Sequence, residues 1–336
     1  DECDEELSSE AVLADMAWTA GVGRSHFDYR AGVVFRDAAS LRDGLKMIAE
    51  ADERPPVAAT KVAFAFTGDG SEWVGTGQAL YESEPVVRAV LDRCDAVLRQ
   101  ERSASLLDVM FGRTDSKGAL DDPAWTQPAI YALECSLAAL WASVGIRPSA
   151  VVGQGLGELA AAQAAGVFGL EEGLRLAAAR GADEPLEGIA GAPPALALVS
   201  SVTGRVMEGG DALDEAYWQR QASESVAFDR CVETLAELDV QVVVEIGPDA
   251  ALGPKVASAW PKSADGAGMP VVLSSLGTSQ ENDGFTEAVA GAYEAGLAVS
   301  FAGLFAGETR SRISLPGYPF QRRRHWIEAR PASRVE

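Results

Sequence analysis

Short runs of apolar and β-branched residues recur along the chain, and longer alanine-rich or amphipathic segments separate them. Strands that are covered on both faces read as continuous apolar runs, so the short runs predict buried strands. These strands are expected at residues 61–66, 151–153, 196–202, 240–246 and 271–274. Helices are expected at residues 85–99, 130–144, 158–166, 170–180 and 216–238. Alternating strands and helices favour an α/β fold, a doubly wound and mainly parallel sheet covered by helices.

Smaller segments flank this core. A strand at residues 32–35 and an amphipathic helix at 41–51 predict a small αβ unit. The acidic residues at the start of the chain predict a disordered end. The expected divisions are 1–12 for the acidic end, 13–58 for the αβ unit, 59–308 for the core and 309–336 for a tail.

The net charge of the chain limits the classes of partner that it is expected to bind. It has 28 lysines and arginines against 50 aspartates and glutamates, a net charge of −22 over 336 residues. Nucleic acids and anionic membranes are bound through clustered cations, so we expect neither as a partner. The one basic cluster, Arg322–Arg323–Arg324, is expected to be a surface strip along a neighbouring subdomain, with a partner contact as the alternative.

No apolar run is long enough to cross a membrane, and the acidic start does not read as a signal peptide. A cytoplasmic location is therefore expected. The four cysteines, Cys3, Cys94, Cys135 and Cys231, are far apart and form no metal-ligand spacing. We expect reduced thiols, no metal and no cofactor.

The segment VVGQGLGE at residues 151–158 has the frame of a nucleophile elbow, the sharp turn between a strand and a helix that exposes one reactive side chain. A serine or cysteine would have to stand at the centre of the motif, and here the centre is Gly155. A plain glycine-rich turn that links strand to helix is the alternative interpretation.

Six ordered segments resemble the acyltransferase region of modular type I polyketide synthases and its flanking linkers, over residues 15–328. They are LADMAWT with RSHFDYR at 13–30, FTGDGSEWVGTG at 66–77, TQPA at 126–129, the elbow, EIGP at 245–248, and LPGYPFQ with His325 and Trp326. The resemblance implies a hydrolase-like core, a linker unit at 13–58 that follows a ketosynthase, and a tail that wraps back across the linker.

The departures from the family pattern fall on the residues that carry its chemistry. The resemblance places the nucleophilic serine at Gly155, the histidine before it at Gln154, and a glutamine of the oxyanion hole at Asp69. A carboxylate at Asp69 would repel an oxyanion, but the preferred interpretation is an inert, solvated loop aspartate. The arginine that clamps a malonyl carboxylate in the family is kept as Arg180.

The catalytic base is also missing from its expected place. In the family it lies in a small lid of about eighty residues between the arginine and a Val-Ser-x-Val-Thr-Gly strand, whereas only residues 181–198 separate these features here. Such a length suits a loop or one short helix. The chain has two histidines, His26 and His325, and both belong to linker motifs. A hydroxyl without a base is a poor nucleophile.

The residues expected to line the emptied site are Asp69, Gln127, Gln154, Gly155, Leu156 and Arg180, with no catalytic residue among them. For Arg180 the structural alternative, a charge at the end of a helix beside Gly181, is preferred over carboxylate binding. Gln127 is expected to cap or orient a helix, and Glu158 to favour the dipole of the elbow helix.

Two function classes follow. The preferred one is an inactive acyltransferase-like domain that holds a ketosynthase, an acyl carrier protein or an adjacent modifying domain in a polyketide synthase. The other is residual binding of a malonyl- or methylmalonyl-type acyl group, or its transfer to a carrier protein. Docking of a separate, trans-acting acyltransferase is a weaker third idea.

Overall fold

Five parallel strands form the centre of the structure, in the order β3-β2-β1-β4-β5. Their bounds are β1 Val62–Phe66, β2 Ala150–Gly153, β3 Ala197–Val199, β4 Val242–Ile246 and β5 Val271–Ser274. In the central strand, Phe64 lies opposite Val151 on one side and Val244 on the other. All five predicted strands are present, and the parallel arrangement is confirmed.

A computed structural model provides these coordinates, and it describes residues 10–51, 56–68, 74–102, 104–113, 119–186, 189, 191–208, 210–224, 227–262, 268–276 and 283–317. The core helices are α4 Gln78–Ser83, α5 Pro85–Arg102, α6 Leu106–Met110, α7 Pro123–Ser143, α8 Gly157–Ala164, α9 Leu170–Gly181, α10 Glu215–Ser223, α11 Phe228–Glu237, α12 Gly253–Ala259 and α13 Asp283–Glu294, with a short 3-10 turn at Ala119–Asp121. The flanking helices are α2 Glu10–Gly23, α3 Ala38–Glu50 and α14 Phe301–Leu304.

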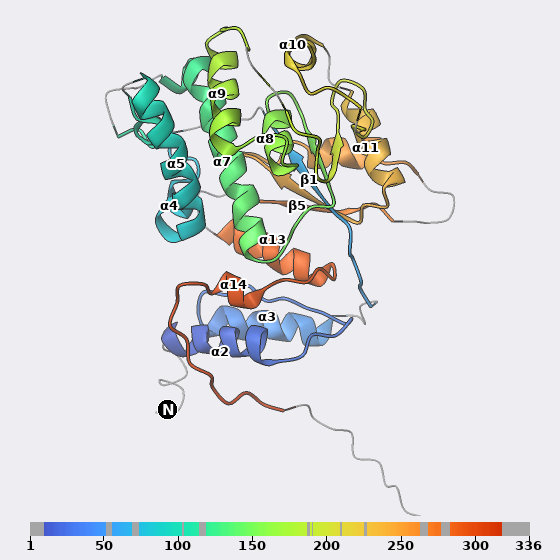
Figure 1. The fold of residues 1–336 in the computed structure, drawn as a ribbon. Coiled ribbons are helices and arrows are strands. Elements are labelled where there is room, and N and C mark those ends of the chain that lie inside the picture. Colours follow the sequence, from blue (N-terminus) through green and yellow to red (C-terminus); the bar gives the residue numbers. More distant parts are fainter. Residues whose placement is uncertain are drawn as a thin grey trace, which may run out of the picture.

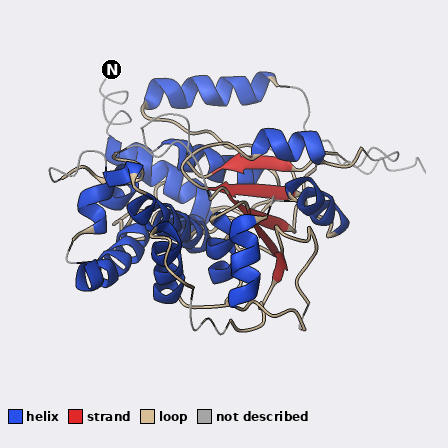
Figure 2. Ribbon diagram, turned by 90° about the horizontal axis from the view of Figure 1, so that it is seen from above, coloured by secondary structure: helices blue, strands red, loops and turns tan. Residues whose placement is uncertain are grey.

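Helices cover both faces of the sheet (Figure 2). Successive strand residues point to opposite faces, so Phe64 and Phe66 pack with α5, α7 and α9, whereas Ala63 and Ala65 pack with α11 and α12. The larger cluster contains most of the buried aromatic and leucine side chains, and alanine and valine dominate the strand positions facing α11 and α12. This confirms the predicted doubly wound architecture.

Helix α7 begins earlier than the sequence predicts. Asp122 caps it, since its side chain accepts a hydrogen bond from the Ala124 N–H at 2.9 Å. Pro128 lies inside the helix and has no N–H to bond the Ala124 carbonyl, and the Arg102 guanidinium donates to that carbonyl instead. The expected capping role of Gln127 is therefore wrong, because Asp122 holds that position.

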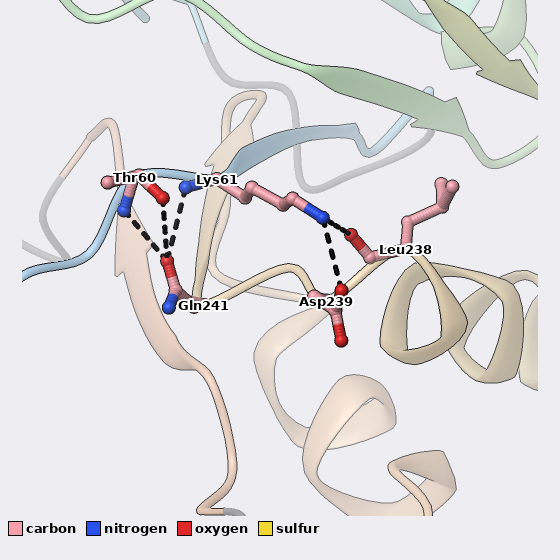
Figure 3. A network of polar contacts seen from close by, with 5 residues as sticks. All are labelled: Thr60, Lys61, Leu238, Asp239 and Gln241. Carbon is pink, nitrogen blue, oxygen red and sulfur yellow. Dashed lines mark hydrogen bonds and ion pairs between the residues drawn. The ribbon is translucent and has the colours of Figure 1, made fainter.

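The amino end of β1 is tied to β4 by a set of polar contacts (Figure 3). The Gln241 side-chain oxygen accepts hydrogen bonds from the Thr60 N–H at 2.7 Å and the Lys61 N–H at 3.2 Å. The Lys61 ammonium donates to the Leu238 carbonyl at 2.9 Å and pairs with Asp239 at 3.2 Å. These contacts hold β1 and β4 in register at the amino ends of the two strands, whereas the elbow lies at the carboxyl ends.

The flanking unit differs from the prediction in two ways. Residues 10–23 form α2, so the acidic end predicted over 1–12 is helical from Glu10 onward; residues 1–9 lie outside the described part of the chain. The strand predicted at 32–35 is not present: this segment joins no sheet in the described residues, and the Gly32 N–H donates to the Glu294 side chain at 2.9 Å. The expected αβ unit is therefore helical in its described residues.

The carboxyl-terminal segment returns to α2, as the resemblance implies. The Ser311 N–H donates to the Asp15 side chain at 3.0 Å, and the Ile313 N–H donates to the Thr19 hydroxyl at 3.1 Å. Arg24 donates to the carbonyls of Leu315 and Pro316. Helices α2, α3 and α14 gather at one end of the molecule, while α10 lies at the other (Figure 1).

Candidate functional site

The elbow lies where β2 turns into α8, at the carboxyl edge of the sheet. Gln154, Gly155 and Leu156 form the turn, and the Gln154 N–H donates to the Phe66 carbonyl at 2.9 Å. Gly155 has φ of 55°, in the left-handed region that side chains adopt only with strain. The strand, strained turn and helix of a nucleophile elbow are therefore all present around a residue without a side chain.

Glycines allow the loops after β1 and β2 to touch at this point. A Cβ atom on Gly68 would lie 2.0 Å from the Gln154 carbonyl oxygen, and one on Gly157 would lie 2.5 Å from the Phe66 carbonyl oxygen. Gly153 is equally confined, with the Glu158 nitrogen 2.2 Å from its hypothetical Cβ. These three glycines have a packing role, which favours neither interpretation of the turn.

Three of the predicted site residues come together at the elbow. The Gly155 carbonyl accepts a hydrogen bond from the Gln221 side-chain amide at 2.5 Å, and the Gln221 oxygen accepts one from Arg180 at 2.7 Å. Lys255 donates to the Gln154 side chain at 2.8 Å. Arg180 also lies in the last turn of α9, which confirms its predicted position at a helix end.

Gln221 and Lys255 are the site residues that the sequence prediction missed. Gln221 comes from α10, where Tyr217, Trp218 and Gln221 form the buried face. That spacing indicates a buried glutamine, but it gives no information on which loop the amide reaches. Leu156, another predicted site residue, is 2% exposed and packs in the core.

Glu158 is fully buried in the first turn of α8 and binds several donors. It accepts hydrogen bonds from the Ser201 N–H at 3.2 Å, from the Ser201 hydroxyl and from the Tyr217 hydroxyl. Burial raises the pKa of Glu158, and the hydrogen bonds from Ser201 and Tyr217 act in the opposite direction. Its role therefore exceeds the predicted helix-dipole effect, because it joins α8 to β3 and α10.

The loop after β1 is held by another buried carboxylate. Glu134 on α7 is fully buried and accepts hydrogen bonds from the Gly68 N–H at 2.8 Å and the Thr67 hydroxyl at 3.2 Å. Asp69, the next residue, lies outside the described part of the chain, so its predicted role stays a prediction. Gln127 lies inside α7, and its side-chain oxygen is buried with no hydrogen-bond partner in the structure.

His26 lies far from the elbow, at the joint between α2 and the core. Its ring nitrogens lie 2.9 Å from the Tyr293 hydroxyl and 2.8 Å from the Gly21 carbonyl oxygen, and its ring stacks on Phe301. Since the carbonyl can only accept, Nε2 carries a proton. His325 and the Arg322–Arg324 cluster lie outside the described residues.

Other candidate features of the described residues offer little chemistry. Cys94, Cys135 and Cys231 are buried free thiols, as predicted, and no described group of three His, Cys, Asp or Glu side chains has metal-binding geometry. None of the helices in the described ranges is long and apolar enough to span a bilayer.

An apolar cavity of about 20 Å³ holds roughly a water molecule, far below the size of a ligand pocket. Its lining is Thr76, Met110, Leu120, Ala129, Ile130, Leu133 and Pro248.

Comparison with known proteins gives matches to both parts of the chain. Residues 63–184 match the acyl transferase domain family, and residues 6–45 match the family described as CurL-like, PKS C-terminal. Polyketide synthase GfsB of Streptomyces halstedii is 28% identical over 413 residues, which include 94% of this chain and 7% of GfsB. The spectinabilin polyketide synthase system protein NorA' of Streptomyces orinoci is 30% identical, over 96% of this chain and 11% of that protein. The chain thus spans a small part of these relatives.

Solved acyltransferase domains have the same fold. The acyltransferase domain from the second module of the salinomycin polyketide synthase superimposes with a TM-score of 0.75 and 25% identity, covering 92% of each chain. The acyl transferase domain of ZmaA has a TM-score of 0.78 and 21% identity, over 90% of this chain and 91% of that one. At the latter identity the likeness concerns the fold alone.

Proposed function

The chain is an acyltransferase-type domain of a modular polyketide synthase, and we propose that it is a catalytically inactive one that serves as a structural or docking domain of its module. The observation that carries this proposal is the identity of residue 155. The backbone at the centre of the elbow has the strained φ of 55° at which a nucleophile would stand, yet the residue is glycine. Glycine has no atom that can attack a thioester.

Among the described residues, the side chains that hydrogen-bond to the turn at Gly155 include no base. Its neighbours include the amides of Gln154 and Gln221 and the guanidinium of Arg180, none of which accepts a proton at neutral pH. In one serine protease, loss of the nucleophile alone lowers turnover by about a millionfold, or about 8 kcal/mol of barrier. We therefore infer that acyl transfer through a covalent intermediate does not take place here.

The short connector after Arg180 supports the proposal. The described residues between 182 and 196 contain no helix or strand, and the match to the acyl transferase family ends at residue 184. The alignment with GfsB runs over 413 residues although this chain has only 336, so the aligned part of the relative includes residues that have no counterpart in this chain. We infer that the lid and its histidine are among the missing parts.

The preserved flanking unit supports a structural role. Residues 6–45 match a polyketide synthase family of their own, and the segment 311–316 is hydrogen-bonded along α2. A domain that is retained for its contacts with neighbouring domains is expected to keep its fold and flanking segments while it loses its catalytic residues. The partners that we propose are the ketosynthase, the acyl carrier protein or an adjacent modifying domain of the same synthase.

Deletion within the parent module tests this function. Residues 59–308 would be replaced by a flexible linker in one variant, and Gly155 by alanine in a control that leaves the frame in place. We expect the deletion to lower product formation and the association of neighbouring domains by size-exclusion chromatography, whereas G155A leaves both unchanged. Unaltered assembly and activity after the deletion would contradict a docking role.

Residual carboxylate binding is the second candidate, and Arg180 is the observation that favours it. A guanidinium binds carboxylates through paired N–H donors, and this one reaches the elbow. Binding alone would not restore transfer, because the site still lacks a nucleophile. Docking of a trans-acting acyltransferase has no support from the described contacts.

A further inference from the structure

Helix α10 is fastened to the elbow at two points one helical turn apart. Tyr217 donates to the buried carboxylate of Glu158 in α8, and Gln221, four residues later on the same face, donates to the Gly155 carbonyl. The two residues are 3% exposed. Helix α10 lies at the end of the molecule away from α2 (Figure 1). The buried face of α10 therefore closes over the turn.

The orientation of the Gln221 amide follows from its two partners. The Gly155 carbonyl can only accept a hydrogen bond, so the amide nitrogen faces it at 2.5 Å. The Arg180 guanidinium can only donate, so the amide oxygen faces it at 2.7 Å. The reversed amide would lose both contacts, which leaves one orientation.

We propose that Gln221 acts as an internal ligand of Arg180 and closes the elbow to acidic ligands. Its side-chain oxygen takes the place on the guanidinium that a carboxylate oxygen of a free ligand would need. A small dicarboxylate such as malonate must displace a buried amide that is already bonded at both ends. This inference rests on the proposed function, since it describes the ligand access of a site without turnover.

Malonate titration of the purified chain tests this inference, by isothermal calorimetry at about 0.15 M ionic strength to screen the net charge of −22. The test variant is Q221A, and the matched control is Q219A, which changes an exposed glutamine of the same helix. We expect Q221A to bind malonate at least about tenfold more tightly than the wild type, since hydrogen bonds to charged groups are strong. The control should bind as the wild type does.

The gain in malonate affinity that is expected for Q221A must depend on Arg180. The double variant Q221A/R180A should lose the affinity that Q221A acquires, and circular dichroism should show that each variant is folded. A folded Q221A that binds no better than the wild type would overturn the inference. Should Q221A fail to fold, the wild type and R180A decide: equally weak binding supports the closed site, and wild-type binding that R180A abolishes overturns it.

The two proposals fail in different ways. Binding of malonate by the wild type as tightly as by Q221A, without acyl transfer, would contradict the internal ligand and leave the inactive domain standing. Acyl transfer from malonyl-CoA by the wild type would contradict the proposed function itself. The calorimetric and the transfer measurements therefore separate them.

Discussion

At Gly155 the backbone has the conformation of a nucleophile elbow, but the residue has no side chain. Substitution by serine would supply the missing hydroxyl. We expect G155S to unfold with a free energy at least about 1 kcal/mol lower than the wild type, because an L side chain at φ of 55° is strained. The hydroxyl should remain unacylated by malonyl-CoA in intact-mass spectra, because none of the described side chains bonded at the turn is a base that could activate it.

Gly166 provides the matched control for this substitution. It has φ of 78° at the end of α8, and a Cβ atom there would meet only Ala195, at an ordinary contact distance of 3.8 Å. G166S should thus carry a similar backbone strain away from the elbow. Rapid acylation of G155S, compared with G166S, would reveal a base that the account does not contain.

Glu158 makes a pH-dependent contribution to stability. Burial raises its pKa above the ordinary 4.5, so the folded protein holds this proton more tightly than the unfolded chain does. The contribution of Glu158 to the free energy of unfolding is therefore constant at pH values below 4.5, and it decreases as pH rises towards the folded-state pKa.

Substitution by glutamine removes this titration. We expect E158Q to gain free energy of unfolding relative to the wild type as pH rises from about 4.5 to 7, measured by chemical denaturation. Burial also raises the pKa of Glu245, but that residue is present in both proteins and cancels in the difference. A difference that does not vary with pH would contradict the account.

The core strands were predictable from the sequence, whereas the segment predicted as one helix at 216–238 forms the two helices α10 and α11, and the flanking elements were also less predictable. Each strand is a short apolar run, and buried parallel strands need no alternation to be recognised. Helix α2 escaped prediction because its apolar residues surround the helix rather than forming one stripe. Val33 and Val34 have strand propensity, but no neighbouring strand is available to pair with them in the described structure.

The contacts within the site were harder to predict from the sequence than the identity of its residues. Gly155, Gln154 and Arg180 were identified from the motif, and the structure brings them together. Gln221 lies 66 residues beyond Gly155, and its amide reaches the elbow only because α10 packs there. Glu158 was identified in the first turn of a helix, but its burial depends on β3 and α10.

Arg30 holds the flanking unit to the core. It donates to the Phe27 and Leu297 carbonyls at 2.8 Å each, and its guanidinium lies 5.0 Å from the centre of the Tyr293 ring. We expect R30A to lower the free energy of local opening of α2 by about 1–2 kcal/mol, measured by amide hydrogen exchange.

The control for this prediction is R42A, which removes an exposed arginine of α3. Exchange in β1 and β4 should be unchanged in both variants, because the sheet does not depend on the flanking unit. If R30A leaves the protection of α2 at the wild-type level, Arg30 is not what fastens this helix.

At the scale of the whole molecule, the fold of an acyltransferase surrounds an elbow that has glycine at its centre. The sheet, the elbow turn and the flanking helices are kept, whereas the residue at the centre of the turn is glycine. A domain of this kind can bind its neighbours without transferring an acyl group. The net charge of −22 favours partners that present basic surfaces to it.

Intact-mass spectrometry of the purified chain tests the central claim most directly. The chain would be incubated with malonyl-CoA or methylmalonyl-CoA, with and without a carrier protein, beside an active acyltransferase domain as the positive control. The account predicts an unchanged mass for this chain and no acylation of the carrier above the enzyme-free blank. A covalent acyl adduct on the chain, or carrier acylation faster than the blank, would contradict it.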